Sequence, residues 1–180
     1  MIPIYLIMTT GRTGSDYLQG CLDGLDTILS FCGKFEYHNF FKKNKNIKDN
    51  KKLIEKFVYE NMPLFSYDSV EDIDKKVDHK KLINIFVKLS GSSKIDRKVF
   101  FLNLYKAYNL TINKDLSTAK ALVHHSHGII NTKRCLLDFP DAKLFITIRD
   151  PRANLKSGLE NWFKYDAERK NMEHVYLYIK

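Results

Sequence analysis

The hydrophobic pattern of the chain predicts several β-strands of a parallel sheet. Ile4–Met8 and Lys143–Ile148 are short, nearly continuous apolar runs, which are typical of strands buried on both faces. Ala119–His124 has a similar pattern and predicts another strand. The apolar and aromatic segment Ile28–Phe41 predicts a second strand in chain order, together with the loop that follows it.

Between these runs, apolar residues recur at helical spacing. After a glycine loop, the first helical pattern begins at Asp16 and ends near Gly24. Alternating strands and helices predict a single α/β domain over residues 1–180, with a central parallel sheet and helices on its faces. Residues 42–116 are expected to form a variable helical insertion in this domain. The remaining helices are predicted over Lys52–Tyr59, Lys80–Leu89, Arg97–Tyr108, Thr132–Asp138, Ala153–Phe163 and Glu168–Lys180.

Composition excludes two classes of protein. The chain has 180 residues, of which 44% are hydrophobic and 28% are charged, which is typical of a globular protein and not of a disordered one. The apolar runs are much shorter than a bilayer span, so no transmembrane segment is expected. The start of the chain lacks the basic region of a signal peptide. Three cysteines without CxxC spacing predict reduced thiols and a cytoplasmic protein.

The charge balance favours an anionic partner. Lys and Arg number 30 against 21 Asp and Glu, which gives a formal net charge of +9. Nucleic acid, a membrane surface and a small anionic ligand all fit such an excess. Many lysines lie between Lys42 and Lys56, where a run of charge is more often a solvated face than a binding site. Within this run, Lys42–Asn50 is predicted to be the most flexible stretch of the chain.

The glycine loop after the first strand carries groups that can bind a phosphate. Its backbone N–H groups and the following helix N-terminus attract anions, and Arg12 adds a full positive charge. A strand-to-helix turn that merely needs glycine is the structural alternative. A Walker A loop is disfavoured because Gly14 is followed by Ser15-Asp16, with no Gly-Lys-Ser/Thr. The loop consists of Thr9, Thr10, Gly11, Arg12, Thr13, Gly14 and Ser15, and Asp16 follows it.

A second candidate phosphate site follows the strand predicted near residue 148. Arg149 comes at the end of this strand, at the carboxyl edge where open α/β sheets bind ligands. Ser157 lies eight residues later, two turns into the next helix, and could face back towards the strand end. Together the two side chains could hold a phosphate. The alternative is a surface ion pair of Arg149 with Asp150 or Glu160.

With both motifs considered, the sequence resembles the sulfotransferase family that uses 3′-phosphoadenosine 5′-phosphosulfate (PAPS). Thr10 to Ser15 is similar to the family's 5′-phosphosulfate loop, and Leu144 to Arg152, continuing to Ser157, is similar to its 3′-phosphate site. The resemblance implies a P-loop-like three-layer α/β fold. It also implies transfer of a sulfuryl group from PAPS to a hydroxyl or amine of a carbohydrate, lipid or small metabolite. The nucleotide product would be adenosine 3′,5′-bisphosphate.

The resemblance also assigns roles to the residues that bind the cofactor. The backbone amides of residues 13–16 and the Ser15 hydroxyl would hold the 5′-phosphate, and Arg149 with Ser157 would hold the 3′-phosphate. Arg12 would neutralise the charge that develops on the bridging oxygen as the sulfuryl group leaves. No metal is required by this scheme.

Two residues compete for the role of general base. Glu36 lies in the region where several relatives with arginine in the loop place a catalytic glutamate. His127 lies at the distance before Arg149 where cytosolic relatives carry their catalytic histidine, and a neutral imidazole is a competent base. Glu36 is slightly preferred.

Other interpretations stay open at this point. A P-loop-type nucleotide kinase or other phosphotransferase would need the lysine of a Gly-Lys-Ser/Thr sequence, which the glycine loop lacks. A non-catalytic basic module would bind nucleic acid through residues 42–56, but no helix-turn-helix, RNA-recognition motif or zinc finger supports a nucleic-acid partner. His124, His125 and His127 could be metal ligands, although alternating directions in a strand argue against this. The family's domains are usually longer, so the chain is expected to be a truncated fragment or a minimal relative.

Overall fold

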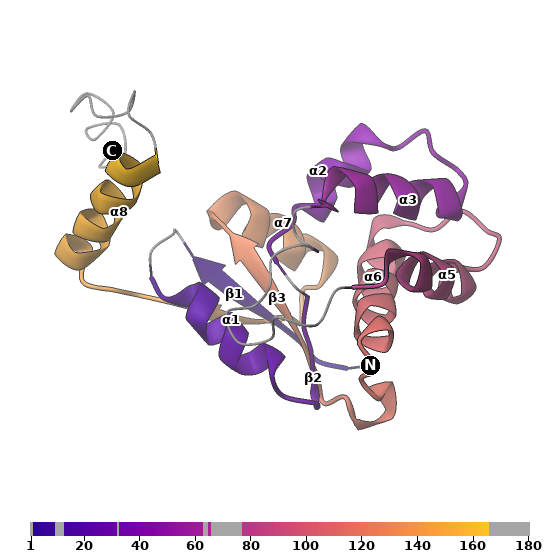
Figure 1. The fold of residues 1–180 in the computed structure, drawn as a ribbon, viewed down its shortest axis with the longest axis horizontal. Helices are drawn as coiled ribbons and strands as arrows, with labels where there is room; N and C mark the ends of the chain where they lie inside the picture. The colour runs from indigo at the N-terminus through magenta and orange to yellow at the C-terminus, as the bar shows by residue number, and fades with distance from the viewer. Residues whose placement is uncertain (1, 10–12, 32, 63–64, 66–76, 166–180) are drawn as a thin grey trace.

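The protein has a four-stranded, all-parallel β-sheet between layers of helices (Figure 1). The structure is a computed structural model that describes residues 2–9, 13–31, 33–62, 65 and 77–165. The sheet order is β2-β3-β1-β4. This arrangement is the three-layer α/β class that the alternating pattern predicts. The strands are β1 (Ile4–Thr9), β2 (Ile28–Leu29), β3 (Ala121–His127) and β4 (Lys143–Ile146).

The register of the sheet brings the ends of three strands to one edge. β1 pairs with β3 from Ile4 opposite Leu122 to Thr9 opposite His127. On its other side, β1 pairs with β4, with Met8 opposite Ile146. Because the strands are parallel, the segments that follow β1, β3 and β4 all leave the same carboxyl edge.

The helices that follow β1 and β3 cover opposite faces of the sheet. Helix α1 (Ser15–Asp23) contacts β3 through Gln19, whose Oε1 lies 2.6 Å from His125 Nδ1. Helix α7 (Ile129–Asp138) contacts the next residue of β3, because the Thr132 hydroxyl lies 3.0 Å from the Ser126 hydroxyl. Successive strand residues point to opposite faces. The chain therefore leaves β1 and β3 towards opposite faces at their carboxyl ends, which is the position where open sheets bind ligands.

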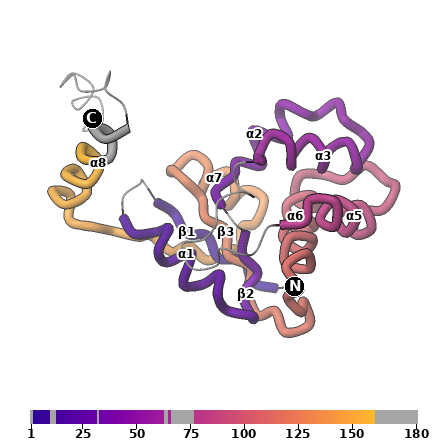
Figure 2. Tube along the Cα trace, viewed as in Figure 1, coloured from indigo at the N-terminus to yellow at the C-terminus, as the bar shows by residue number. Residues whose placement is uncertain are grey.

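The middle of the chain forms a helical layer on one face of the sheet, as Figures 1 and 2 show. Side chains of Asp49, Asp78 and Asp96 cap the N-termini of three of these helices by accepting hydrogen bonds from first-turn amides. The helices are α2 (Tyr37–Lys43), α3 (Asn50–Glu60), α5 (His79–Ser90) and α6 (Arg97–Thr111), and a short 3₁₀ helix, η1 (Leu116–Thr118), follows.

Aromatic rings fill the core between this layer and the sheet. The ring centroids of Phe31 and Phe35 lie 4.8 Å apart, as do those of Phe101 and Tyr105. Full burial of each such side chain stabilises the fold by about 1.5–3 kcal/mol relative to exposure. The fully buried aromatic residues are Tyr37, Tyr105, Phe31, Phe57, Phe86, Phe100 and Phe101.

The prediction of a strand and its following loop over Ile28–Phe41 is correct as far as residue 36 but wrong for residues 37–41, which are helical. β2 spans only Ile28–Leu29, and α2 begins at Tyr37. An apolar run of this kind fits a buried strand and a buried helix equally well, and here most of its aromatic side chains belong to the helical core. The stretch predicted as most flexible, Lys42–Asn50, forms the end of α2, the connection that follows it and the first residue of α3. Its side chains include buried Asn50, whose Nδ2 donates to the carbonyl oxygens of Gly91 and Ser93 at 3.0 and 2.8 Å.

The prediction that the strand ending near residue 148 is buried is also wrong. β4 is an edge strand that pairs with β1 alone in the described sheet. The side chains of Phe145 and Ile146 are 50% and 53% exposed. Helix α8 (Pro151–Tyr165) includes the predicted helix Ala153–Phe163 and begins two residues earlier, but it lies apart from the sheet in Figure 1. Apolar character therefore identified the strand but not its burial. The helix predicted over Glu168–Lys180 lies outside the described residues.

The helices were also compared with the length and apolar character of a membrane span. None of the helices in the part of the chain that the structure describes is long and apolar enough to span a bilayer.

Candidate functional site

The glycine loop ends on the N-terminus of α1, at the carboxyl edge of the sheet. Gly14 precedes α1 in the left-handed conformation, with φ 81°, which strongly favours glycine. The first backbone hydrogen bond of the helix runs from Leu18 N to Gly14 O at 3.1 Å. The amides of residues 15 and 16 therefore come before the helical hydrogen-bond pattern, in the position that binds anions in other strand–loop–helix sites. Ser15 is buried at 3% exposure. The predicted residues Thr10, Gly11 and Arg12 lie outside the described residues.

Hydroxyl groups link this loop to the second predicted phosphate motif. Thr13 Oγ1 lies 2.9 Å from Thr9 Oγ1, at the end of β1. The same oxygen lies 2.5 Å from Thr147 Oγ1, in the segment that follows β4. Thr147 also donates its backbone N–H to Met8 O at 3.4 Å. The two motifs, which are more than 100 residues apart in sequence, therefore meet at one edge of the sheet.

Arg149 and Ser157 come from different elements beyond this junction. Arg149 is exposed and lies in the connection between β4 and α8, two residues after Thr147. Ser157 is half-buried within α8, the helix that stands apart from the sheet (Figure 1). Asp150, a candidate ion-pair partner of Arg149, pairs with Arg152, and its Oδ2 lies 3.0 Å from the Arg152 guanidinium. The structure thus puts Arg149 at the predicted sheet edge.

The two candidate general bases line one pocket. This pocket has a volume of about 290 Å³ and lies at the carboxyl end of β3. Glu36 immediately precedes α2, and His127 is the last residue of β3. Both are exposed residues. The other lining residues are Lys34, Phe35, Tyr37, His38, Asn61, His124, His125, Ser126, Asn131 and Cys135.

Amide side chains fix the Glu36 carboxylate within this pocket. Asn131 Nδ2 donates to Glu36 Oε1 at 2.6 Å, and Asn39 Nδ2 donates to Glu36 Oε2. Asn131 Nδ2 also donates to the backbone carbonyl of His127 at 3.0 Å. A carboxylate has about four lone-pair positions, so two amide donors orient Glu36 and still leave it able to accept a proton. Sequence analysis missed Asn131, because a single asparagine at the start of a helix carries no motif.

Lys34 places a positive charge between the pocket and the glycine loop. Its Nζ lies 2.6 Å from Asp16 Oδ1, in the first turn of α1. Asp16 Oδ1 lies in turn 3.5 Å from Nδ1 of the buried His125. Burial, and secondarily the charge of Lys34, lowers the pKa of His125 to about 4. Lys34 is a second residue that the sequence did not single out, although it stands two positions before Glu36.

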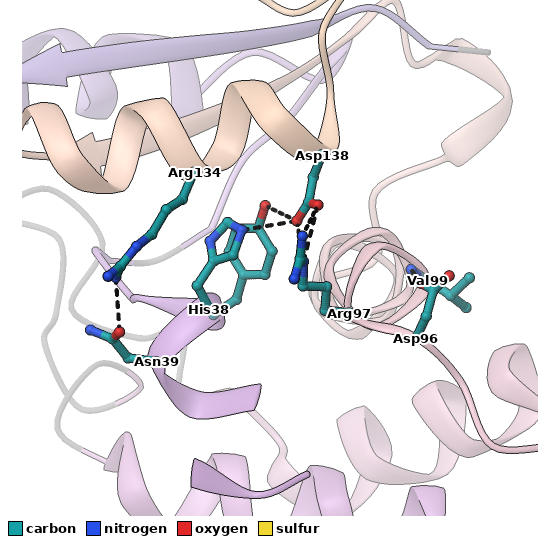
Figure 3. Close-up of polar contacts among 8 residues, drawn as sticks. His38, Asn39, Asp96, Arg97, Val99, Arg134 and Asp138 are labelled. Carbon is teal, nitrogen blue, oxygen red and sulfur yellow. Dashed lines mark hydrogen bonds and ion pairs between the residues drawn. The ribbon is translucent and has the colours of Figure 1, made fainter. Parts of the chain in front are cut away.

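A buried carboxylate anchors the segment that carries Glu36. Asp138, at the end of α7, lies where side chains of α2 and α6 converge (Figure 3). The Tyr37 hydroxyl donates to Asp138 Oδ2 at 3.0 Å, and His38 Nε2 lies 2.9 Å from the same oxygen. Arg97 donates to both carboxylate oxygens, from Nε to Oδ2 at 2.7 Å and from Nη2 to Oδ1 at 2.6 Å. These contacts fix the residues next to Glu36 against two helices.

The pKa values of this cluster follow from burial and charge. Burial alone would raise the pKa of Asp138, but hydrogen bonds from Arg97 and Tyr37 outweigh it and leave the pKa lowered. Burial, followed by the nearby Cys135 and Asp138, raises the pKa of Tyr37 far above its usual value. Burial also lowers the pKa of His38, against the opposing attraction of Asp138. Asp138 is thus an anion among neutral donors and one cation, Arg97.

The histidines of β3 point in different directions. The ring of His124 enters the aromatic core, and its Nδ1 lies 2.8 Å from the Tyr105 hydroxyl. His125 points to Gln19 on the opposite face. Within the described residues, no group of three or more His, Cys, Asp or Glu side chains is arranged to hold a metal. The metal interpretation of these histidines is therefore not supported by their geometry.

Burial of His124 predicts a pH-dependent stability. Burial lowers its folded-state pKa to about 3, against an ordinary value of 6.5. Below pH 6.5, His124 is therefore protonated in the unfolded chain. In the folded chain it stays neutral down to about pH 3. Stability contributed by neutral His124 is complete above pH 6.5 and falls by about 1.4 kcal/mol per pH unit below it.

We expect the variant His124→Asn, which keeps a polar partner for Tyr105, to show a smaller loss of stability between pH 7.5 and pH 5.5 than the wild type. The difference should be about 1 kcal/mol, measured by urea unfolding at both pH values. Equal losses in the two proteins would contradict the assignment of a neutral buried imidazole.

Comparison with known proteins yields no relative. No protein-family model, no curated protein and no solved structure matches the chain significantly. The class that the structure defines is an α/β protein with a four-stranded parallel sheet and a polar pocket at its carboxyl edge. Its chemistry has to be inferred from its own residues.

Proposed function

We propose that the protein is a sulfotransferase that transfers a sulfuryl group from PAPS to a hydroxyl or amine of an acceptor. One observation carries the proposal: a glycine loop with a helix N-terminus and a pocket with a fixed carboxylate lie at the same sheet edge. Lys34 connects them through its 2.6 Å ion pair with Asp16. The resemblance of both motifs to sulfotransferase sites supports the same reaction.

The residues near the loop fit the phosphate end of this cofactor. The amides of residues 15 and 16 lie in the first turn of α1, before the helical hydrogen-bond pattern begins, and the helix dipole adds partial positive charge there. A Cβ atom added at Gly14 would meet no atom of the described residues within 4 Å, so these residues leave space beside the turn. Lys34 neutralises Asp16, the acidic residue that would otherwise repel a phosphate from this helix end. Arg149 would bind the 3′-phosphate, from its place directly after the junction at Thr147.

The reaction is an in-line displacement at sulfur. The acceptor oxygen or nitrogen forms a bond to sulfur, the bond from sulfur to the bridging phosphate oxygen breaks, and that oxygen keeps the electron pair. When bound, PAPS supplies the activated sulfuryl group. In this proposal Glu36 takes the proton of the acceptor, and cations at the loop neutralise charge on the leaving phosphate. Catalysis then depends on positioning and charge, as in phosphoryl transfer.

The contacts within the pocket favour Glu36 over His127 as the base. Two amide donors, from Asn39 and Asn131, hold the Glu36 carboxylate from two different helices. The bond from Asn131 to His127 is made through the backbone carbonyl and does not orient the imidazole. A general base must be held within hydrogen-bond reach of the acceptor. The oriented carboxylate therefore fits the role better.

Nucleotide binding tests the proposal directly. We expect adenosine 3′,5′-bisphosphate to bind more tightly than ADP in calorimetric titrations without magnesium. Arg149→Ala should weaken the bisphosphate by about 10–100-fold, the equivalent of a charge-assisted hydrogen-bond pair, and leave ADP binding nearly unchanged.

Arg152→Ala is the matched control, because Arg152 is highly exposed and pairs with Asp150. It should leave the preference intact. A preference for ADP, or ATP turnover that requires magnesium, would favour a phosphotransferase and contradict the proposal.

A further inference from the structure

A second and larger cleft lies beside the candidate active site. It has a volume of about 900 Å³ and is bounded by α2, the turn after α2, the start of α6 and the last turns of α7. His38 lines both this cleft and the smaller pocket. We refer to it as the basic cleft, because cations dominate its described lining. The cationic lining residues are Lys42, Lys45, Lys94, Arg97, Lys98 and Arg134.

The carboxylates of the basic cleft do not offset this charge. The two that line it are Asp96 and Asp138. Asp138 is buried and already bound by Arg97. Asp96 caps α6 by accepting a hydrogen bond from Val99 N at 2.8 Å. The cleft lining therefore has more lysine and arginine side chains than carboxylates. A concave site with an excess of positive charge attracts anionic ligands.

Several of these groups are held in place before any ligand binds. Arg97 is fixed by its hydrogen bonds to both carboxylate oxygens of Asp138, and Arg134 Nη1 donates to Asn39 Oδ1 at 3.0 Å (Figure 3). Lys94 Nζ donates to the backbone carbonyl of Lys45 at 3.4 Å, which joins the two turns on either side of the cleft. Anchored guanidinium groups keep their orientation, which lowers the entropy cost of binding an anion.

The size and lining of the cleft favour a small ligand over nucleic acid. Its volume lies within the range of small-molecule sites, about 300–1,000 Å³. Single-stranded nucleic acid needs exposed aromatic faces on which bases stack. The aromatic ring of the lining, Phe41, is half-buried and packs edge-on against Phe100, with 5.1 Å between ring centroids. Apolar side chains of Ile47, Ile95 and Leu137 complete the lining and suit the carbon skeleton of an organic anion.

We propose that the basic cleft binds a small organic oligoanion that carries two or more sulfate, phosphate or carboxylate groups. If the proposed function holds, this oligoanion is the acceptor itself. A direct path supports that step: Arg134 bonds to Asn39, and Asn39 bonds to Glu36. Asn39 would thus link an anion held by Arg134 to Glu36, the residue that takes the acceptor's proton, so the enzyme would sulfate molecules that are already acidic.

The test compares two variants of equal net charge. Lys45→Glu with Lys98→Glu reverses two exposed cleft residues, and Lys52→Glu with Lys120→Glu reverses two exposed lysines outside the cleft. The probes are a disulfated disaccharide, inositol hexakisphosphate and citrate. They show whether the cleft binds sulfate, phosphate or carboxylate groups. The unsulfated disaccharide and a short DNA duplex serve as comparisons.

We expect at least one oligoanion to bind the wild type in calorimetry and to lose 10-fold or more of its affinity in the cleft variant. The control variant should lose less than threefold. Equal losses in both variants, tighter binding of DNA than of every small anion, or binding of none of the probes would overturn the inference.

Adenosine 3′,5′-bisphosphate separates this inference from the proposed function. Binding of the oligoanion should be unchanged by saturating bisphosphate and by Arg149→Ala, since Arg149 does not line the cleft. If the oligoanion and the bisphosphate displaced each other, both would bind at a single site. That result would overturn the inference that the basic cleft is a separate binding site. Oligoanion binding without bisphosphate binding would leave the cleft in place and remove the sulfotransferase proposal.

Discussion

Asp138→Ala is expected to lower the free energy of unfolding by about 3 kcal/mol. The change removes the acceptor for the Tyr37 hydroxyl and for all the hydrogen bonds that Arg97 donates to Asp138. Breaking a buried ion pair from one side costs about 3–5 kcal/mol, but the Arg97 side chain is 49% exposed, so water compensates part of the loss. Urea unfolding at pH 7 measures the effect.

Asp141→Ala is the matched control, because Asp141 is an exposed carboxylate three residues further along the chain. It should change stability by less than about 0.5 kcal/mol. A loss below 1 kcal/mol for Asp138→Ala would show that the cluster does not anchor α2.

The same carboxylate gives a pH signature. Because its folded-state pKa lies below the ordinary value, the stability from Asp138 is complete above the unfolded-state pKa of about 4 and is lost as pH falls through the lower folded-state pKa. The stability difference between the wild type and Asp138→Asn should therefore be constant from pH 7 to about pH 5 and shrink below pH 4.

Glu36→Gln is expected to lower kcat by about 10²–10⁴-fold, the usual contribution of a general base. Glutamine keeps the length of the side chain and can still accept from Asn131, but it cannot take a proton. Affinity for adenosine 3′,5′-bisphosphate should stay within a factor of two to three. Initial rates of sulfate transfer to an acceptor that the wild type modifies provide the measurement.

His127→Gln distinguishes the two candidate bases. It lines the same pocket, and if Glu36 is the base its kcat should stay within about 10-fold of the wild type. A greater loss of kcat in His127→Gln than in Glu36→Gln would assign the proton transfer to the imidazole.

Local sequence patterns predicted the elements that build the candidate site. The strand before Thr9, the helix after Ser15 and the placement of Arg149 after a strand all depend on short stretches of chain. β3 was also predicted, although it runs on to His127. Periodicity and glycine position are local properties, so a single sequence can reveal them.

Contacts between distant segments could not be predicted in the same way. Tyr37, Arg97 and Asp138 come from three helices, and none of them stands in a motif that signals the others. The basic cleft was missed for the same reason. Sequence analysis interpreted the lysines between Lys42 and Lys56 as a solvated face, because the sequence does not show that α6 and α7 pack beside them. The burial of β4 was mispredicted for a related reason: an apolar strand gives no sign of whether a neighbour covers it.

The position of β1 in the middle of the sheet determines when the candidate site can assemble during folding. β1 is the first strand in the chain, yet its partners β3 and β4 begin at Ala121 and Lys143. Pairing across so long a separation is slow, because the entropy of closing a long loop must be overcome first. The helices between Asn50 and Thr111 contact near neighbours and can form earlier. The glycine loop should therefore reach its folded position last, so the nucleotide binding that we propose would report completion of folding rather than an early intermediate.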